Sequence, residues 1–357
     1  MSFYNILAIG DPHFKTDNIT ETEQFCKELH KYITVNCSFI DTIVVLGDIL
    51  HTHEKLHTSA LNTAVDFFKM LVSFKKKVFV LVGNHDAVSN TIFLTTNHWL
   101  NVLKEWNTIT VVDYPIKFNI SKNEFITLCP YVPEGRMIEA LNFVDDWKES
   151  RLIFGHQTID GVKMGMIVAE NVEEWKDSYP MLISGHIHDR QRVKHNLYYT
   201  GSSLQHSYGE GGDNSICLIK LCDEIQITEI YLSLRRKKIL YGSIDELEKI
   251  MKNLKDKNND VEYKIVLKGK VEDFKAVKKS SVFKEAMELS NVKTISFKQN
   301  IIELNEQDKT SSIISDDFCE HLDNLVKKTN DVYLISLYEH IVLGKNEKEI
   351  EDIIFID

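Results

Sequence analysis

The stretch VFVLVGNHD, residues 78–86, decides the fold because an apolar run ends in a glycine followed by Asn84, His85 and Asp86. Four other apolar runs end in a similar way: NILAIGD (5–11), TIVVLGD (42–48), RLIFGH (151–156) and MLISGH (181–186). Continuous Val, Ile and Leu runs of this length are typical of strands buried on both faces. Ligands bind beyond the carboxyl ends of the strands in open α/β sheets, so these polar residues are expected to meet at one site.

Two helical stretches, residues 20–36 and 58–74, separate the first three apolar runs. Such an alternation predicts βαβ units and an α/β fold. The chain has 357 residues, which is enough for two or three domains. Hydrophobic residues make up 43% and charged residues 27%, values that are ordinary for a folded protein and argue against disorder.

The sequence pattern changes after residue 234. We expect an α+β module with helices near 243–257 and 272–290 and strands at 261–269 and 292–298. Two further helices are expected at 315–328 and 331–343. The predicted domains are therefore residues 1–234, 235–301 and 302–357.

No run approaches the 18 apolar residues of a membrane span, and no basic segment precedes the first apolar stretch. We therefore expect a cytoplasmic protein that does not enter a membrane. The six cysteines form no C-x-x-C pair, which argues against both a disulfide framework and a thiolate zinc site.

Ten residues of ligand type follow the five apolar runs. They are Asp11, His13, Asp48, His51, Asn84, His85, Asp86, His156, His186 and His188. One His or Asp after a strand is usually a cap or turn residue, but that explanation does not account for ligand-type residues at all five strand ends. Imidazole, carboxylate and amide donors suit manganese, iron or zinc, and the set is too large for one ion. It predicts two ions bridged by a carboxylate such as Asp48, an arrangement suited to phosphoryl displacement.

The motifs GDPH (10–13), GDILH (47–51), GNHD (83–86), GH (155–156) and GHIH (185–188) resemble, in this order, the five motifs of the calcineurin-like metallophosphoesterases. The resemblance implies a four-layer α-β-β-α sandwich. It also implies one metal held by Asp11, His13, Asp48 and His188, and a second held by Asp48, Asn84, His156 and His186. His85 would stabilise the transition state or the leaving oxygen, and Asp86 would orient His85.

Three further features resemble the SbcD-type nucleases that act on DNA double-strand breaks. They are GDILHTHEKLHTSAL (47–61), in which His51 is a candidate catalytic residue, the loop YYTGSSLQHSYGE (198–210), and the order of core, small module and terminal helices. The resemblance implies two Mn²⁺ ions per chain, with Mg²⁺, Fe²⁺ or Zn²⁺ as alternatives. It implies 3′-to-5′ exonuclease action on duplex ends and endonuclease action on single strands or hairpins, in DNA repair, recombination or replication. The implied partners are an SbcC-like SMC-type ATPase, docked on the terminal helices, and a second copy of the chain within a heterotetramer.

The charge is unevenly distributed along the sequence. The net charge is −11, yet residues 235–300 contain 17 Lys and Arg against 10 Asp and Glu. Each cation that neutralises a phosphate releases counterions and so adds sequence-independent affinity for DNA. The densest cluster, Arg235, Arg236, Lys237 and Lys238, is the predicted DNA-binding segment, although a solvated lysine-rich surface is the alternative.

Two other functions stay open at this stage. The small-substrate alternative is a phosphoesterase acting on phosphomonoesters or cyclic nucleotides, which has no use for the basic module or the terminal helices. The other is a non-catalytic scaffold that retains the fold, against which the intact ligand positions argue. The Lys-, Asn- and Ile-rich composition hints at an AT-rich genome, bacterial or viral.

Overall fold

The computed structural model describes residues 3–211, 214–255 and 260–299, and seven positions beyond residue 320. By its contacts the chain divides into two units, Met1–Gln299 and Asn300–Asp357. The boundary expected at residue 234 stays a prediction. The helices expected at 315–328 and 331–343 fall almost wholly outside the described residues, although the seven described positions there are helical.

The first of two six-stranded sheets has the order β14-β13-β1-β2-β3-β4. Its strands are β1 Tyr4–Ile9, β2 Thr42–Val45, β3 Lys77–Leu81, β4 Ile109–Val112, β13 Ile216–Leu221 and β14 Ile225–Ile230. Strands β1 to β4 are parallel to one another, and β13 and β14 add an antiparallel edge. The parallel pairing confirms the βαβ units expected from the sequence.

The second sheet has the order β11-β12-β10-β7-β6-β5. Its strands are β5 Ile116–Asn119, β6 Phe125–Leu128, β7 Leu152–His156, β10 Leu182–Gly185, β11 Gln191–Lys194 and β12 Leu197–Tyr199. The inner four are parallel, whereas β5 and β11 run antiparallel to their neighbours. A short hairpin, β8 Lys163–Met164 and β9 Ile167–Val168, stands apart from both sheets.

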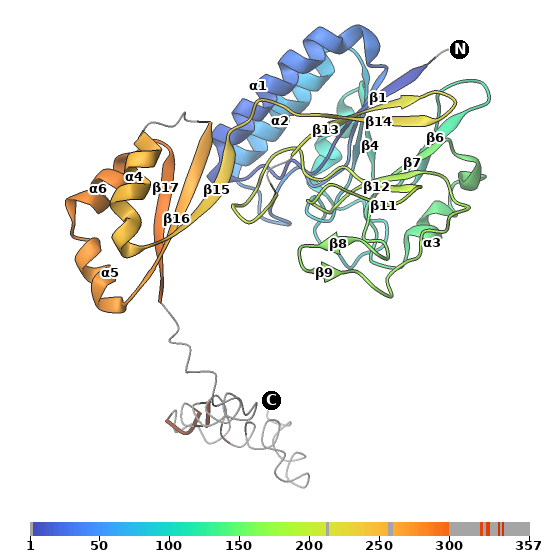
Figure 1. Ribbon diagram of the computed structural model, residues 1–357. Coiled ribbons are helices and arrows are strands. Elements are labelled where there is room, and N and C mark those ends of the chain that lie inside the picture. Colours follow the sequence, from blue (N-terminus) through green and yellow to red (C-terminus); the bar gives the residue numbers. More distant parts are fainter. Residues whose placement is uncertain are drawn as a thin grey trace. The chain divides into compact units, whose positions relative to one another are not determined.

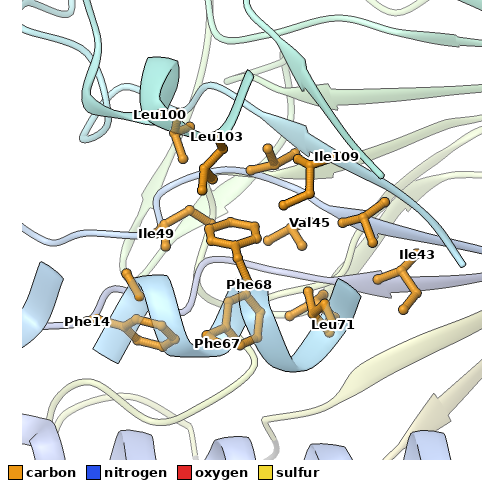
Figure 2. Packing of buried hydrophobic residues seen from close by; sticks show 14 of the residues in the cluster. Phe14, Ile43, Val45, Ile49, Phe67, Phe68, Leu71, Leu100, Leu103 and Ile109 are labelled. Atoms are coloured by element: carbon orange, nitrogen blue, oxygen red, sulfur yellow. The ribbon is translucent and has the colours of Figure 1, made fainter. Parts of the chain in front are cut away.

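Three apolar cores hold the layers together. Helices α1 Ile19–Asn36 and α2 Thr58–Ser73 lie side by side (Figure 1) and bury residues such as Phe25 against the first sheet. Figure 2 shows Phe67 of α2 in this core. The second core lies between the two sheets. The third packs the short helix α3 Met137–Leu141, with Trp147 and Trp175, on the outer face of the second sheet. This arrangement confirms the four-layer sandwich, with an outer layer made mostly of loops.

The small module is a parallel sheet, β15 Arg236–Ser243, β16 Val261–Gly269 and β17 Val292–Gln299, with helices α4 Leu247–Lys255, α5 Val271–Val277 and α6 Ser281–Glu288. It has a separate apolar core. The expectations for this module were wrong in two respects. Strand β15 was not expected, and the helix expected at 272–290 is two helices, because the side chain of Ser280 caps α6 through a hydrogen bond from Phe283 N. Within the described ranges, no helix has the length and apolar content needed to cross a bilayer.

Candidate metal centre

The predicted metal ligands lie together where strands of both sheets end. They follow or end strands β1, β2, β3, β7 and β10: Asp11, His13, Asp48, Asn84, His156, His186 and His188. Three overlapping groups of side chains have ligand atoms within 4.8 Å of one another: His13, His51 and His85; Asp48, His156 and His186; and Asp11, His13 and Asp48. Strand ends that are far apart in the sequence thus build one site.

Asp48 lies between two sets of ligands. Its Oδ2 atom is 3.4 Å from Nε2 of His13, and its Oδ1 atom is 3.4 Å from Nε2 of His156. A carboxylate that faces two ligand sets with separate oxygens is arranged to bridge two metal ions.

Each ligand set converges further. In the first, the Nε2 atoms of His13 and His188 are 3.0 Å apart. In the second, Oδ1 of Asn84 is 3.0 Å from Nε2 of His156 and 2.8 Å from Nδ1 of His186. The structure thus brings together residues that the resemblance assigned to each ion, and their binding of metal stays a prediction.

The backbone is strained at four of the ligands. The φ angles are 36° at Asp11, 41° at His13, 50° at Asp48 and 80° at His186. Residues with a Cβ rarely adopt positive φ, and such strain concentrates at functional sites. Close packing adds to this constraint, because a Cβ on Gly83 would lie 2.2 Å from Oδ1 of Asp48.

Burial and the neighbouring carboxylates set the ionisation of the ring nitrogens at the centre. Burial lowers the pKa of His13 well below its ordinary value and that of His186 to about 3, so both rings are neutral, the form that binds metal. Burial opposes the charge of His156 as well, but the carboxylate of Asp48 raises the pKa of that ring to about 9. The carboxylates therefore draw positive charge into the centre.

An unpaired oxygen supports the same conclusion. Among the described residues, Oδ2 of Asp11 is buried without a hydrogen-bond partner. A buried polar atom left unpaired costs about 1–3 kcal/mol, which a bound cation would offset. The donor set therefore fits two divalent ions, and which metal it binds stays a prediction.

His85 stands beside the bridging carboxylate. Its main-chain N–H donates to Oδ1 of Asp48 at 2.8 Å, and its ring Nδ1 lies 2.6 Å from the main-chain oxygen of His51. A carbonyl can only accept a hydrogen bond, so Nδ1 carries the proton and Nε2 is left for a substrate. The His51 ring lies 5.6 Å from that of His85, so His51 is close to the centre. Its catalytic role stays a prediction.

The expectation that Asp86 orients the His85 ring is wrong. The Asp86 carboxylate accepts hydrogen bonds from the main-chain N–H groups of Gly83 and Ile49, each at 3.1 Å, and from Nε1 of Trp99 at 2.9 Å. In the described part of the chain none of its bonds reaches the imidazole. Asp86 instead ties the loop after β3 to the loop after β2.

Three residues at the centre were missed from the sequence. His53 stacks on His85, with ring centroids 4.5 Å apart. His206 places Nε2 2.8 Å from the main-chain oxygen of Asp11, and Glu210 places Oε1 3.4 Å from Nδ1 of His188. Two stretches already quoted contain them: GDILHTHEKLHTSAL contains His53, and the loop YYTGSSLQHSYGE contains His206 and Glu210.

The four cations predicted to bind DNA do not share one environment. They are Arg235, Arg236, Lys237 and Lys238. The guanidinium of Arg235 lies 3.4 Å from the carboxylate of Glu262. The side chain of Lys237 is only 9% exposed and lies 3.7 Å from Glu21. These two cations face carboxylates of the protein itself, whereas Arg236 and Lys238 are exposed, and DNA binding by the four residues stays a prediction.

The chain is similar to several known proteins. The sequence profile of the calcineurin-like phosphoesterases matches residues 4–190. A protein of Invertebrate iridescent virus 6, named as a phosphoesterase, is 42% identical over 290 residues, covering 78% of this chain and 98% of the viral protein. Another protein so named, from Invertebrate iridescent virus 3, is 38% identical over 289 residues, covering 80% of this chain and 82% of that viral protein. The match to the solved structure of a dimetal phosphatase from Danio rerio covers 63% of this chain and 95% of the phosphatase, with 12% identity and a TM-score of 0.44.

Proposed function

The chain belongs to the calcineurin-like phosphoesterase family, and from this premise we propose that it is a manganese-dependent DNA nuclease of the SbcD type. Family membership and the ligand groups together indicate a metal-dependent phosphoester hydrolase. The proposal adds the DNA substrate, the choice of manganese and the role in double-strand break repair, recombination or replication.

The residues of the metal centre would have different roles in phosphoester hydrolysis. Two divalent ions bound there would activate water and neutralise charge on the phosphate. Asp48 is placed to hold both ions, and Asp86 fixes the loops after β2 and β3 against each other. His85 presents Nε2 because His51 binds its Nδ1, so Nε2 is the atom expected to stabilise a phosphate oxygen or the leaving oxygen.

One observation carries the choice of a polymeric substrate: a hollow of about 510 Å³ lies between the loop that carries Glu210 and strand β15. Exposed Arg236 and Lys238 line it, together with Tyr241. Glu210 lies 3.4 Å from the metal ligand His188, so the hollow begins beside the metal centre. A nucleic-acid strand has further phosphates to pair with these cations, whereas a small phosphomonoester has none.

The small-substrate alternative also has an observation in its favour. Arg235 and Lys237 are paired with Glu262 and Glu21, which halves the cationic cluster that remains for DNA. The complete ligand sets argue against the non-catalytic scaffold, and a chain that bound no metal would restore that hypothesis.

Partners and location belong to the proposal as well. An SbcC-like ATPase would dock on residues 302–357, which lie almost wholly outside the described structure. A homodimer within a heterotetramer follows from the SbcD likeness alone. The viral sources of the two relatives support a location in the cytoplasm of infected cells.

The test is digestion of a 3′-end-labelled linear duplex by the purified chain with Mn²⁺, Mg²⁺ or chelator. We expect Mn²⁺-dependent release of nucleotides that is lost in His85→Ser and kept in His195→Ser, which changes an exposed histidine outside the centre. Hydrolysis of a generic phosphomonoester without release from DNA would contradict the nuclease and favour the small-substrate alternative.

A further inference from the structure

We propose that Glu210 is a positioning residue that orients the metal ligand His188, and that contacts with the small module hold the loop of residues 205–210 in place. This inference rests on the proposed function only in requiring bound metal ions. It does not depend on DNA as the substrate.

Glu210 lies at the far side of a ligand ring. Nε2 of His188 lies 3.0 Å from Nε2 of His13, while Nδ1 of the same ring lies 3.4 Å from Oε1 of Glu210. A carboxylate at Nδ1 keeps the proton on that nitrogen and leaves the Nε2 lone pair for a metal. Glu210 is itself well held, because its side chain is 17% exposed and its Oε2 accepts a 2.7 Å hydrogen bond from the main-chain N–H of His206.

The same loop contacts the end of β1. Nε2 of His206 lies 2.8 Å from the main-chain oxygen of Asp11. The His206 ring is buried, with its centroid 5.0 Å from that of His13 and 5.2 Å from that of His188. One loop therefore packs against three ligands of the first set, Asp11, His13 and His188.

The loop is also fixed to two strands of the module. The side-chain amide of Gln205 accepts a hydrogen bond from the main-chain N–H of Lys237 at 2.7 Å and donates one to its oxygen at 3.0 Å. The hydroxyl of Tyr208 donates to the carboxylate of Glu262. Lys237 lies on β15 and Glu262 on β16, so the module supports the first ligand set through this loop. Loss of the module would then impair metal binding even for a small substrate.

The test is Mn²⁺ titration of the full chain, without DNA, by calorimetry and by electron paramagnetic resonance. For Glu210→Gln we expect one of two binding events to weaken about 10- to 100-fold and the other to stay unchanged. The matched control is Glu173→Gln, because Glu173 also accepts main-chain hydrogen bonds, from Met137 at 2.8 Å and Ile138 at 3.0 Å, but does not contact a ligand ring. Equal unfolding temperatures in chelator would show that each variant folds.

A second variant tests the anchor to the module. Tyr208→Phe removes one hydrogen bond to Glu262, and we expect it to weaken the same binding event about two- to tenfold. Wild-type affinity for both ions in Glu210→Gln and Tyr208→Phe would overturn the inference, but it would not bear on the proposed nuclease activity. Conversely, a wild-type chain that binds two ions but does not cut DNA would refute the nuclease and leave the inference standing.

Discussion

The imidazole of His53 stacks on the imidazole of His85, with ring centroids 4.5 Å apart and an angle of 21° between the planes. The ring of His51 is also nearly parallel to that of His85, and the main-chain oxygen of His51 holds Nδ1 of His85. The ring expected to face the substrate is therefore fixed by the loop after β2. Asp86, its neighbour in the sequence, takes no direct part in this.

The first prediction concerns the stacking residue. His53→Ala is expected to lower kcat about two- to tenfold with little change in KM, because an aromatic contact contributes about 0.5–1.5 kcal/mol to holding the His85 ring. Steady-state kinetics with a phosphodiester substrate measure this. His53→Phe keeps the stacked ring and should stay near wild type, as should His57→Ala, which changes an exposed residue of the same loop. A wild-type kcat in His53→Ala would show that the stacking has no part in catalysis.

The core strands and helices could be predicted because local signals and burial agree there. Each of the five apolar runs is a strand buried between layers, and α1 and α2 begin and end within one or two residues of the expected bounds. Strand β15 was missed because its first residues, Arg236 to Lys238, are all cationic. It forms because it pairs in register with β16 along its whole length, from Arg236 with Val261 to Ser243 with Lys268, a tertiary effect that outweighs local propensity.

The metal centre could be predicted only in part, for a related reason. Each candidate ligand follows or ends its strand, so spacing along the chain was enough to select residues that the structure brings together. The contact of Glu210 with His188 joins residues 22 positions apart through a loop whose path no local pattern specifies. Arg235 and Lys237 were assigned to DNA because their partners, Glu262 and Glu21, are distant in sequence.

The second prediction separates exposed from paired cations. Changing both Arg236 and Lys238 to Ala should reduce the slope of log affinity for single-stranded DNA against log salt by about 0.7 for each phosphate that is no longer neutralised. Binding titrations at several salt concentrations measure the slope. Arg235→Ala should leave the slope unchanged and instead lower the free energy of unfolding, because it removes the cation that faces the buried carboxylate of Glu262 and leaves that carboxylate with only the Tyr208 hydroxyl among these two partners. An unchanged slope in the double variant would show that these two cations of β15 do not contact DNA phosphates.

The third prediction concerns the backbone beneath the bridging ligand. In Gly83→Ala the new Cβ would lie 2.2 Å from Oδ1 and 2.4 Å from the main-chain N of Asp48, so Asp48 or the loop after β3 must move. Such overpacking costs about 1–3 kcal/mol of folding free energy, measurable by urea unfolding. Because the two oxygens of Asp48 face separate ligand sets, Mn²⁺ titration should show that both binding events weaken together. Gly211→Ala is the control, since its Cβ would meet no atom within 4 Å. If only one event weakened in Gly83→Ala, Asp48 would serve one ion and not bridge two.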